Sequence, residues 1–540
     1  MNDALSGRGE QLAALARHRF DLLVIGGGIT GCGIARDAAL RGLSVALVEK
    51  NDFASGTSSR SSRLIHGGVR YLEHGQIHLV FESSAERRRL LRLAPHLVRP
   101  LEFTWPVYAG SRIPRWKLQA GLTLYDALAL FRNVGRHHGL SRRDALAREP
   151  MLRSDGLLGG ACYYDAATND ARLTLANAIG AAEAGAVVVN HVEATTLIIE
   201  HGRVAGAMIR DASTGASIDT RARIVVNATG PWSDELRHLD DATGPAVRGS
   251  KGAHVAVPRE RIGNHSALTL LSPIDGRVLF VLPAGAHAIV GTTDTYTSAS
   301  PDEVRATNGD VAYLLEAANF FFPAAGLTPG DVVSAWAGIR PLLPADGATP
   351  GAASREHAVT TSPHGLVSIT GGKLTTYRVM AADVMRVVLA ALDLKPGSDR
   401  ARSLPLPGGD FSSLDALVAE AARVTGDPSI AHHLVTSHGA RWPRVWNAIS
   451  QPGGGAVVAE GLPYTVGELR YSVRDEMARS LADLLIRRTR VAYETHDRGL
   501  DAAQRSAVEL SALFGWDESA RLAAVRDYAA EAARMFGLDA

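Results

Sequence analysis

Residues 21–50 read DLLVIGGGITGCGIARDAALRGLSVALVEK, an apolar strand followed by a glycine-rich turn, an alanine-rich helix and a second apolar strand. This order predicts a β-α-β unit. Gly26 permits the tight turn, Gly28 lets a pyrophosphate approach the backbone, and Gly31 lets the helix pack on the strand. The helix N-terminus offers amide donors and a partial positive charge to the phosphates. The stretch therefore predicts a dinucleotide-binding site.

The kind of dinucleotide follows from residues outside the turn. Glu49 ends the second strand, where a carboxylate accepts hydrogen bonds from ribose hydroxyls and disfavours the 2′-phosphate of NADP. The glycine motif alone does not separate NAD from FAD. A run of hydroxyls at 57–62, a strand-closing turn at 227–230 and the glycine pair 371–372 before a helical pattern favour flavin. A helix N-terminus suits the flavin N1/C2 carbonyl, which becomes negative on reduction, so we expect FAD.

Composition limits the classes of function. A chain of 540 residues is expected to form two or three domains. Its net charge of +1 provides no global field for nucleic acid. The two cysteines lack metal-ligand or redox-motif spacing, and the N-terminus lacks an apolar signal stretch. We therefore expect a cytoplasmic enzyme that does not cross a membrane.

Several further strand-like runs, scattered through the first three quarters of the chain, imply a mixed architecture. They lie at 186–199, 222–228, 278–283 and 286–290. After the Pro/Gly linker SLPLPGG at 403–409, Ala-, Arg- and Leu-rich segments such as 414–424 and 475–494 follow a helical period. The predicted organisation is an N-terminal extension (1–20), a large α/β region (21–403) and a C-terminal helical domain (404–540).

Eight motifs give the chain a family resemblance. They are residues 24–50, TSSRSSRLIHGGVRYLEHG at 57–75, NDARL at 169–173, NATGPW at 227–232, KGAHVAVP at 251–258, GTTD at 291–294, AGIRPLLP at 337–344 and GGKLTTYR at 371–378. Together they resemble the FAD-dependent glycerol-3-phosphate dehydrogenases. The resemblance implies a Rossmann-like FAD-binding domain interleaved with a mixed or antiparallel substrate-capping sheet, followed by the helical domain. It also implies oxidation of sn-glycerol 3-phosphate to dihydroxyacetone phosphate, with electrons passing to a quinone or to oxygen.

The dinucleotide motif and the resemblance together indicate the cofactor-binding residues. These are Gly26, Gly28, Gly31, Glu49, Lys50, Thr57, Ser58, Ser62, His66, Gly67, Gly68, Val192, Ala228, Gly230, Trp232, Gly338, Gly372, Leu374 and Thr375.

The substrate phosphate needs cationic partners, and guanidinium groups bind two of its oxygens at once. By resemblance we assign Arg70, Tyr71, Arg340, Arg355 and Lys373 to the substrate, although any single cation is more often a solvated surface residue.

The reaction also needs a base, because oxidation of the alcohol releases its hydroxyl proton. His254 is the candidate, since imidazole titrates near neutral pH. A structural histidine on a strand is the alternative. The expected catalytic residues are His254, Arg340 and Lys373.

Two other features concern metals and membranes. The adjacent histidines at 137–138 and 432–433 do not face one ligand position, so we interpret them as surface residues and predict no metal. Residues 112–136 combine aromatic, leucine and basic side chains, which is typical of a segment drawn to anionic lipid. The alternative is an amphipathic helix packed on the core. The resemblance favours peripheral attachment at the cytoplasmic face, and it leaves a homodimer possible.

Two competing functions remain open. An amino-acid or sarcosine-type flavin oxidase needs one carboxylate-binding arginine instead of several cations. A non-catalytic FAD-bound scaffold or sensor would use the helical domain as a partner-binding surface. Residues 487–490 (RRTR) would then be an interaction patch, although a solvated helix face is the simpler interpretation.

Overall fold

The predicted β-α-β unit lies at the centre of the first sheet. The computed structural model describes residues 7–130, 133–241, 243–344, 356–395 and 397–539. Strand β1 (Arg19–Ile25) leads through the glycine turn into helix α2 (Ile29–Leu40) and strand β2 (Val45–Val48). β1 pairs in parallel with both β2 and β10, which places Ile25 beside Val48 and Asn227. The carboxyl ends of these strands therefore meet at one edge, where a nucleotide binds in such sheets.

The remaining strands of this sheet follow the order β18-β19-β10-β1-β2-β7, with an antiparallel ribbon of β8 and β9 beside β10. The bounds are β7 (Val187–Val189), β8 (Val192–Glu200), β9 (Arg203–Asp211), β10 (Ser217–Asn227), β18 (His357–Thr361) and β19 (Val367–Gly371). The single run expected at 186–199 is thus two strands, because His191 takes a left-handed φ of 54° between them. Helices α6 (Asp170–Glu183) and α10 (Tyr377–Ala391) pack with α2 in a shared apolar cluster.

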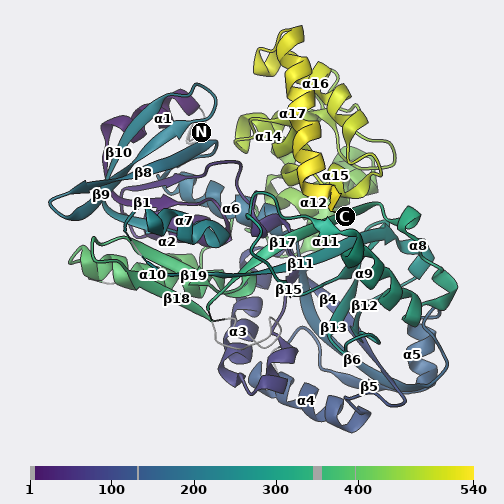
Figure 1. Ribbon diagram of the computed structural model, residues 1–540. Coiled ribbons are helices and arrows are strands. Elements are labelled where there is room, and N and C mark those ends of the chain that lie inside the picture. The colour runs from purple at the N-terminus through teal and green to yellow at the C-terminus, as the bar shows by residue number, and fades with distance from the viewer. Residues whose placement is uncertain (1–6, 131–132, 242, 345–355, 396, 540) are drawn as a thin grey trace.

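The second sheet is mixed and mostly antiparallel, which confirms the expected architecture. Its order is β15-β11-β14-β13-β12-β4-β6-β3, with β17 paired to β11 and β5 to β6. The bounds are β3 (Leu64–Ile65), β4 (Val98–Tyr108), β5 (His138–Leu140), β6 (Leu157–Thr168), β11 (Arg248–Pro258), β12 (Ala267–Leu271), β13 (Val278–Ala284), β14 (His287–Gly291), β15 (Thr295–Tyr296) and β17 (Ser334–Leu342). Because these strands alternate along the chain with those of the first sheet, the two sheets are interleaved (Figure 1).

Helices cover the outer parts of the molecule (Figure 1). Those within the α/β region are α1 (Arg8–Arg17), α3 (Ile77–Leu93), α4 (Arg115–Leu128), α5 (Arg142–Arg148), α7 (Ser233–His238), α8 (Arg259–Ile262) and α9 (Asn308–Phe321). The C-terminal ones are α11 (Leu414–Thr425), α12 (Pro428–His438), α13 (Trp442–Ile449), α14 (Val466–Asp475), α15 (Val491–Glu494), α16 (Leu500–Phe514) and α17 (Glu518–Phe536). A short ribbon joins β16 (Ala306–Thr307) to β20 (Leu538–Asp539). Among the described residues, no helix combines the length and apolarity that a membrane span requires.

The segment 475–494 is not the continuous helix that its period predicts. Helix α14 ends at Asp475, a π-helical turn spans Asp483–Arg488, and α15 follows. Arg487 and Arg488 are almost fully buried, so the interpretation of a solvated helix face is wrong. Both guanidinium groups form ion pairs with the buried Asp52, in the loop after β2, at 2.8 and 2.6 Å.

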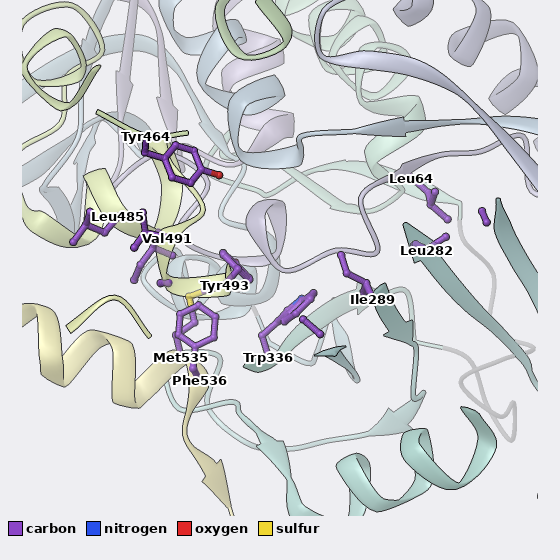
Figure 2. Packing of buried hydrophobic residues seen from close by; sticks show 14 of the residues in the cluster. Leu64, Leu282, Ile289, Trp336, Tyr464, Leu485, Val491, Tyr493, Met535 and Phe536 are labelled. Atoms are coloured by element: carbon purple, nitrogen blue, oxygen red, sulfur yellow. The ribbon is translucent and has the colours of Figure 1, made fainter. Parts of the chain in front are cut away.

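One apolar cluster joins the second sheet to the C-terminal helices. It includes Trp336 from β17, Tyr493 from α15 and Phe536 from α17. Figure 2 shows these aromatic rings together where the sheet meets the helices. The shared cluster packs α15 to α17 against the second sheet, while α11 to α14 also form a smaller apolar cluster of their own.

Candidate active site

A cavity of about 950 Å³ extends from the glycine turn of the first sheet to the inner face of the second. Gly26 and Glu49 line it at the nucleotide end, and His254, Arg340 and Lys373 line it at the other. The cavity has the size of a ligand site, and it brings together residues hundreds of positions apart in the chain.

The glycine turn has the geometry that a dinucleotide requires. A Cβ atom on Gly31 would lie 1.9 Å from the carbonyl oxygen of Gly26, so only glycine allows α2 to pack this closely. Gly26 has a φ of 112°, and Gly28 precedes α2 without a side chain that caps the helix. Glu49 accepts a hydrogen bond from the amide of Gly27 at 2.6 Å and still lines the cavity. The amide of Ile29 at the start of α2 donates to Ser58 Oγ at 3.0 Å, and this helix end and the Glu49 carboxylate fit the pyrophosphate and ribose of FAD.

Most of the predicted cofactor-binding residues line this one cavity. They are Gly26, Gly28, Glu49, Lys50, Thr57, Ser58, Ser62, His66, Gly68, Val192, Ala228, Gly230, Trp232, Gly338, Gly372, Leu374 and Thr375. Gly31 lies behind the turn, in the packing role predicted for it. Gly67 does not line the cavity; its amide donates to Asp165 at 2.9 Å, and a Cβ there would lie 2.2 Å from the Tyr125 hydroxyl.

A second helix start faces the cavity, as the glycine pair predicts. Gly371 and Gly372 have φ values of 77° and 85°, and a 3₁₀ turn from Leu374 leads into α10. A Cβ on Gly372 would lie 2.4 Å from the Met380 sulfur. The chain thus brings backbone amides and the positive end of a helix to the wall of the cavity, where a flavin pyrimidine ring fits.

The cations at the second-sheet end are held by neighbouring groups. One Nη of Arg340 lies 3.1 Å from an Asp294 carboxylate oxygen, and the other lies 3.0 Å from the Thr292 hydroxyl. Lys373 Nζ donates to Ser83 Oγ at 3.1 Å and lies 4.1 Å from the centre of the Tyr71 ring. These contacts direct one guanidinium and one ammonium group toward the same space.

The structure does not describe two other predicted cations. Arg70 lies in the turn Val69–His74, where its side chain is not described, and Arg355 lies outside the described residues.

His254 is buried in β11 and lines the cavity. Its Nε2 lies 2.8 Å from Ser62 Oγ, while Nδ1 has no hydrogen-bond partner among the described residues. Burial, followed by the charges of Arg340 and Arg63, lowers the pKa of His254 to about 3. The imidazole is therefore neutral at physiological pH and able to accept a proton.

Asp294, the last residue of the GTTD motif at 291–294, pairs with Arg340. Sequence reasoning missed several other residues around the site. Phe103, Trp105 and Phe280 form an aromatic part of the wall. Phe103 and Trp105 lie in the continuously buried part of β4, and Phe280 lies in the mostly buried β13, so no local signal distinguishes a cavity wall from core.

One member of each histidine pair, and a third histidine, have acidic partners. His433 is partly buried and bonds to the buried Glu468, and His137 bonds to Asp126 at 2.7 Å, so the surface interpretation is wrong for these two. His191 lies within reach of Asp52 and Asp483, an arrangement of metal-ligand type. Arg487 bonds to both of these carboxylates, which makes the group an ion-pair cluster.

Comparison with known proteins agrees with this geometry. Residues 21–378 match the model of the FAD dependent oxidoreductase family, and residues 400–521 match the C-terminal domain of alpha-glycerophosphate oxidase. Glycerol-3-phosphate dehydrogenase 2 of Mycobacterium tuberculosis is 40% identical over 513 residues, covering 93% of this chain and 86% of its own. The human mitochondrial glycerol-3-phosphate dehydrogenase is 38% identical, covering 92% of this chain and 71% of its own.

A solved structure extends the likeness to three dimensions. The glycerol-3-phosphate dehydrogenase from Bacillus halodurans, complexed with FAD, superposes with a TM-score of 0.82 at 31% identity, covering 98% of both chains. The family resemblance and the expectation of FAD are therefore confirmed. The chain belongs to the FAD-dependent oxidoreductase family and, within it, to the glycerol-3-phosphate dehydrogenases.

Proposed function

We propose that the protein oxidises the C2 hydroxyl of sn-glycerol 3-phosphate and releases dihydroxyacetone phosphate. The observation that carries the proposal is the convergence of Arg340, Lys373 and His254 on the cavity that begins at the dinucleotide turn. FAD, when bound, supplies the acceptor for the hydride that leaves C2.

Each side chain has a separate role in the proposed reaction. Arg340, oriented by Asp294, pairs with the phosphate, and Lys373 adds a second positive charge. His254, held by the contact of its Nε2 with Ser62 Oγ, is a neutral imidazole that accepts the hydroxyl proton. The aromatic wall excludes water from the reacting carbon.

Anaerobic addition of glycerol 3-phosphate to the yellow holoenzyme tests this proposal directly. Bleaching of the flavin is the expected result. A protein that remains oxidised would favour a scaffold or sensor. Glycerol and D-amino acids, compared in the same assay, distinguish the substrate classes, and faster bleaching by an amino acid would favour the oxidase alternative.

Arg340→Ala tests the phosphate assignment. We expect KM for glycerol 3-phosphate to rise by roughly two orders of magnitude, because the guanidinium pairs with a buried dianion. FAD content, measured by absorbance, should be retained. Loss of FAD in parallel with substrate capture would instead mean that Arg340 supports the cofactor fold.

We also propose that the chain docks on an anionic membrane surface and passes its electrons to a quinone there. Helices α3 and α4 lie together at one end of the molecule (Figure 1). They expose Phe81, Trp116 and Leu124, with Trp116 73% exposed, among the basic residues of 112–117. Apolar side chains in a basic setting favour the interface of an anionic bilayer.

Flotation with anionic liposomes tests the docking. Trp116→Glu should reduce the bound fraction severalfold, because the charge opposes insertion and repels the lipid. Leu522→Glu, an exposed position of α17, is the matched control and should leave binding unchanged. Wild-type protein that stays wholly soluble would contradict the docking, and a preference for oxygen over ubiquinone or menaquinone analogues would contradict the acceptor.

A further inference from the structure

The C-terminal helices reach the active site through Tyr493 of α15. Its hydroxyl donates a hydrogen bond to the backbone carbonyl of Ser59 at 2.8 Å, and its own carbonyl accepts one from Ser334 Oγ at 2.8 Å. The ring packs edge-on against Trp336, with centroids 5.1 Å apart (Figure 2). Tyr493 thus contacts both the cavity-lining loop at 57–63 and strand β17.

That loop carries two residues that act on His254. Ser62 bonds to the imidazole edge. Arg63 is buried, with its guanidinium carbon 4.6 Å from the centre of the Tyr493 ring and 5.3 Å from that of Trp336. Among the described residues Arg63 makes no ion pair, so the two aromatic faces are its main partners.

Trp336 connects this arrangement to the base. Its ring stacks on the His254 imidazole with centroids 5.4 Å apart and planes inclined by 12°. On β14, a Cβ atom at Gly291 would lie 2.2 Å from His254 Cδ2, so the glycine leaves room for the imidazole. The imidazole is therefore fixed by Ser62 at its edge and by Trp336 on its face.

The charges around His254 differ in their access to substrate. Arg340 faces it from β17 and Arg63 from the loop, while β14 offers the uncharged Gly291. Arg340 pairs with Asp294, and a bound phosphate would add further negative charge beside it. Arg63 contacts Trp336 and Tyr493 and does not line the cavity, so it keeps its positive charge near the imidazole. This charge adds to burial in lowering the pKa of His254.

We propose that Tyr493 and Arg63 are positioning residues of the reaction, and that the C-terminal helical region completes the active site by locking the 57–63 loop and the Trp336 ring around His254. The inference rests on the proposed function of His254 as the base.

Rates of anaerobic flavin reduction by glycerol 3-phosphate test the inference in a double-mutant cycle. We expect His254→Ala to slow reduction by about 100-fold or more. Arg63→Met should slow it by roughly tenfold when His254 is present and by less than about twofold in the His254→Ala background. Tyr493→Phe removes only the bond to Ser59. It should also slow reduction mainly when His254 is present, and by a smaller factor than Arg63→Met.

The pH profile gives a second readout that a merely structural role does not move. Without the Arg63 charge the pKa of His254 rises, so the acid limb of the reduction rate should move to higher pH by about one unit. Arg63→Lys should return the limb to its wild-type position. Tyr528→Phe removes a buried hydroxyl that bonds to the Arg498 carbonyl in the same helical region, and it should change neither readout.

The outcomes distinguish the positioning role of Arg63 from the role of His254 as the base. Equal losses from Arg63→Met with and without His254, with an unmoved acid limb, would overturn the positioning role while leaving the base assignment intact. A normal rate in His254→Ala would instead overturn the base assignment. FAD content and melting temperature, measured on every variant, identify any loss that comes from misfolding.

Discussion

Two buried histidines illustrate how single residues depend on their surroundings. His96 and His254 each have a ring nitrogen without a hydrogen-bond partner among the described residues. Burial above all, followed by nearby arginines, lowers the pKa of each to about 3. The same residue type serves the cavity in one case and packs beside the C-terminal region in the other, because only His254 faces the space that holds the ligand.

These shifts predict a pH-dependent stability. The unfolded chain protonates histidine near pH 6.5, whereas the folded chain keeps His96 neutral, so stability falls as pH falls below about 6.5. Each such group costs about 1.4 kcal/mol per pH unit in this range. His96→Leu should therefore show a smaller fall in melting temperature between pH 6.5 and 5 than the wild type.

A matched substitution checks this prediction. His138 is exposed on β5, and His138→Gln should keep the wild-type pH dependence. His191 acts in the opposite direction: burial alone would lower its pKa, but Asp483 raises it. The test is therefore the difference between variants in how melting temperature changes with pH. Identical slopes of melting temperature against pH for His96→Leu and wild type would show that His96 does not cause the loss of stability.

At the scale of elements, the β1-turn-α2 unit shows how local sequence produces a binding site. Its strand, glycines and terminal carboxylate are all within 30 residues, and their spacing is enough to predict the turn. The close approach of α2 to the Gly26 carbonyl brings the helix N-terminus to the cavity.

Gly31→Ala should therefore impair cofactor binding. The added methyl group requires α2 to move away from the turn, because the Cβ would lie 1.9 Å from a backbone oxygen. We expect the dissociation constant for FAD, measured by flavin fluorescence, to rise at least about tenfold, since the helix N-terminus leaves the pyrophosphate.

The control is another glycine within a helix. A Cβ on Gly121 in α4 would meet no atom from outside its own helix backbone within 4 Å, so Gly121→Ala should leave FAD affinity unchanged. Its helix should gain up to about 1 kcal/mol of stability. Tight FAD binding by Gly31→Ala would show that the close packing is dispensable.

At the scale of the whole molecule, the two sheets and the C-terminal helices are held together by buried contacts of two kinds. One is the apolar cluster that contains Trp336 and Tyr493. The other is the ion-pair cluster in which Asp52, in the loop after strand β2, meets Arg487 and Arg488. Both place the C-terminal region against the cofactor and substrate sites.

Breaking the ion-pair cluster should lower the free energy of unfolding. Arg488→Met leaves Asp52 with one guanidinium partner, and we expect a loss of about 3–5 kcal/mol in the free energy of unfolding. The double variant Asp52→Leu/Arg488→Met should recover part of this loss, because fewer unpaired charges remain buried. Denaturant unfolding of the holoenzyme measures both.

An exposed pair provides the comparison. Arg521 lies 3.9 Å from Glu518, which is 82% exposed. Arg521→Met should change stability by no more than about 0.5 kcal/mol. A loss as small as this for Arg488→Met would mean that the cluster contributes little to holding the regions together.

The sequence by itself determined the dinucleotide unit, the mixed architecture, the glycine pair before α10 and the family, because each depends on spacing within a short segment or on motifs in order. It did not reveal that 475–494 is broken, that Arg487 and Arg488 are buried, or that Arg63, Trp336 and Tyr493 surround His254. These features depend on contacts between residues up to 436 positions apart. Only the tertiary structure decided them, because burial and partners, not residue type, determine whether an arginine or a histidine is solvated, structural or catalytic.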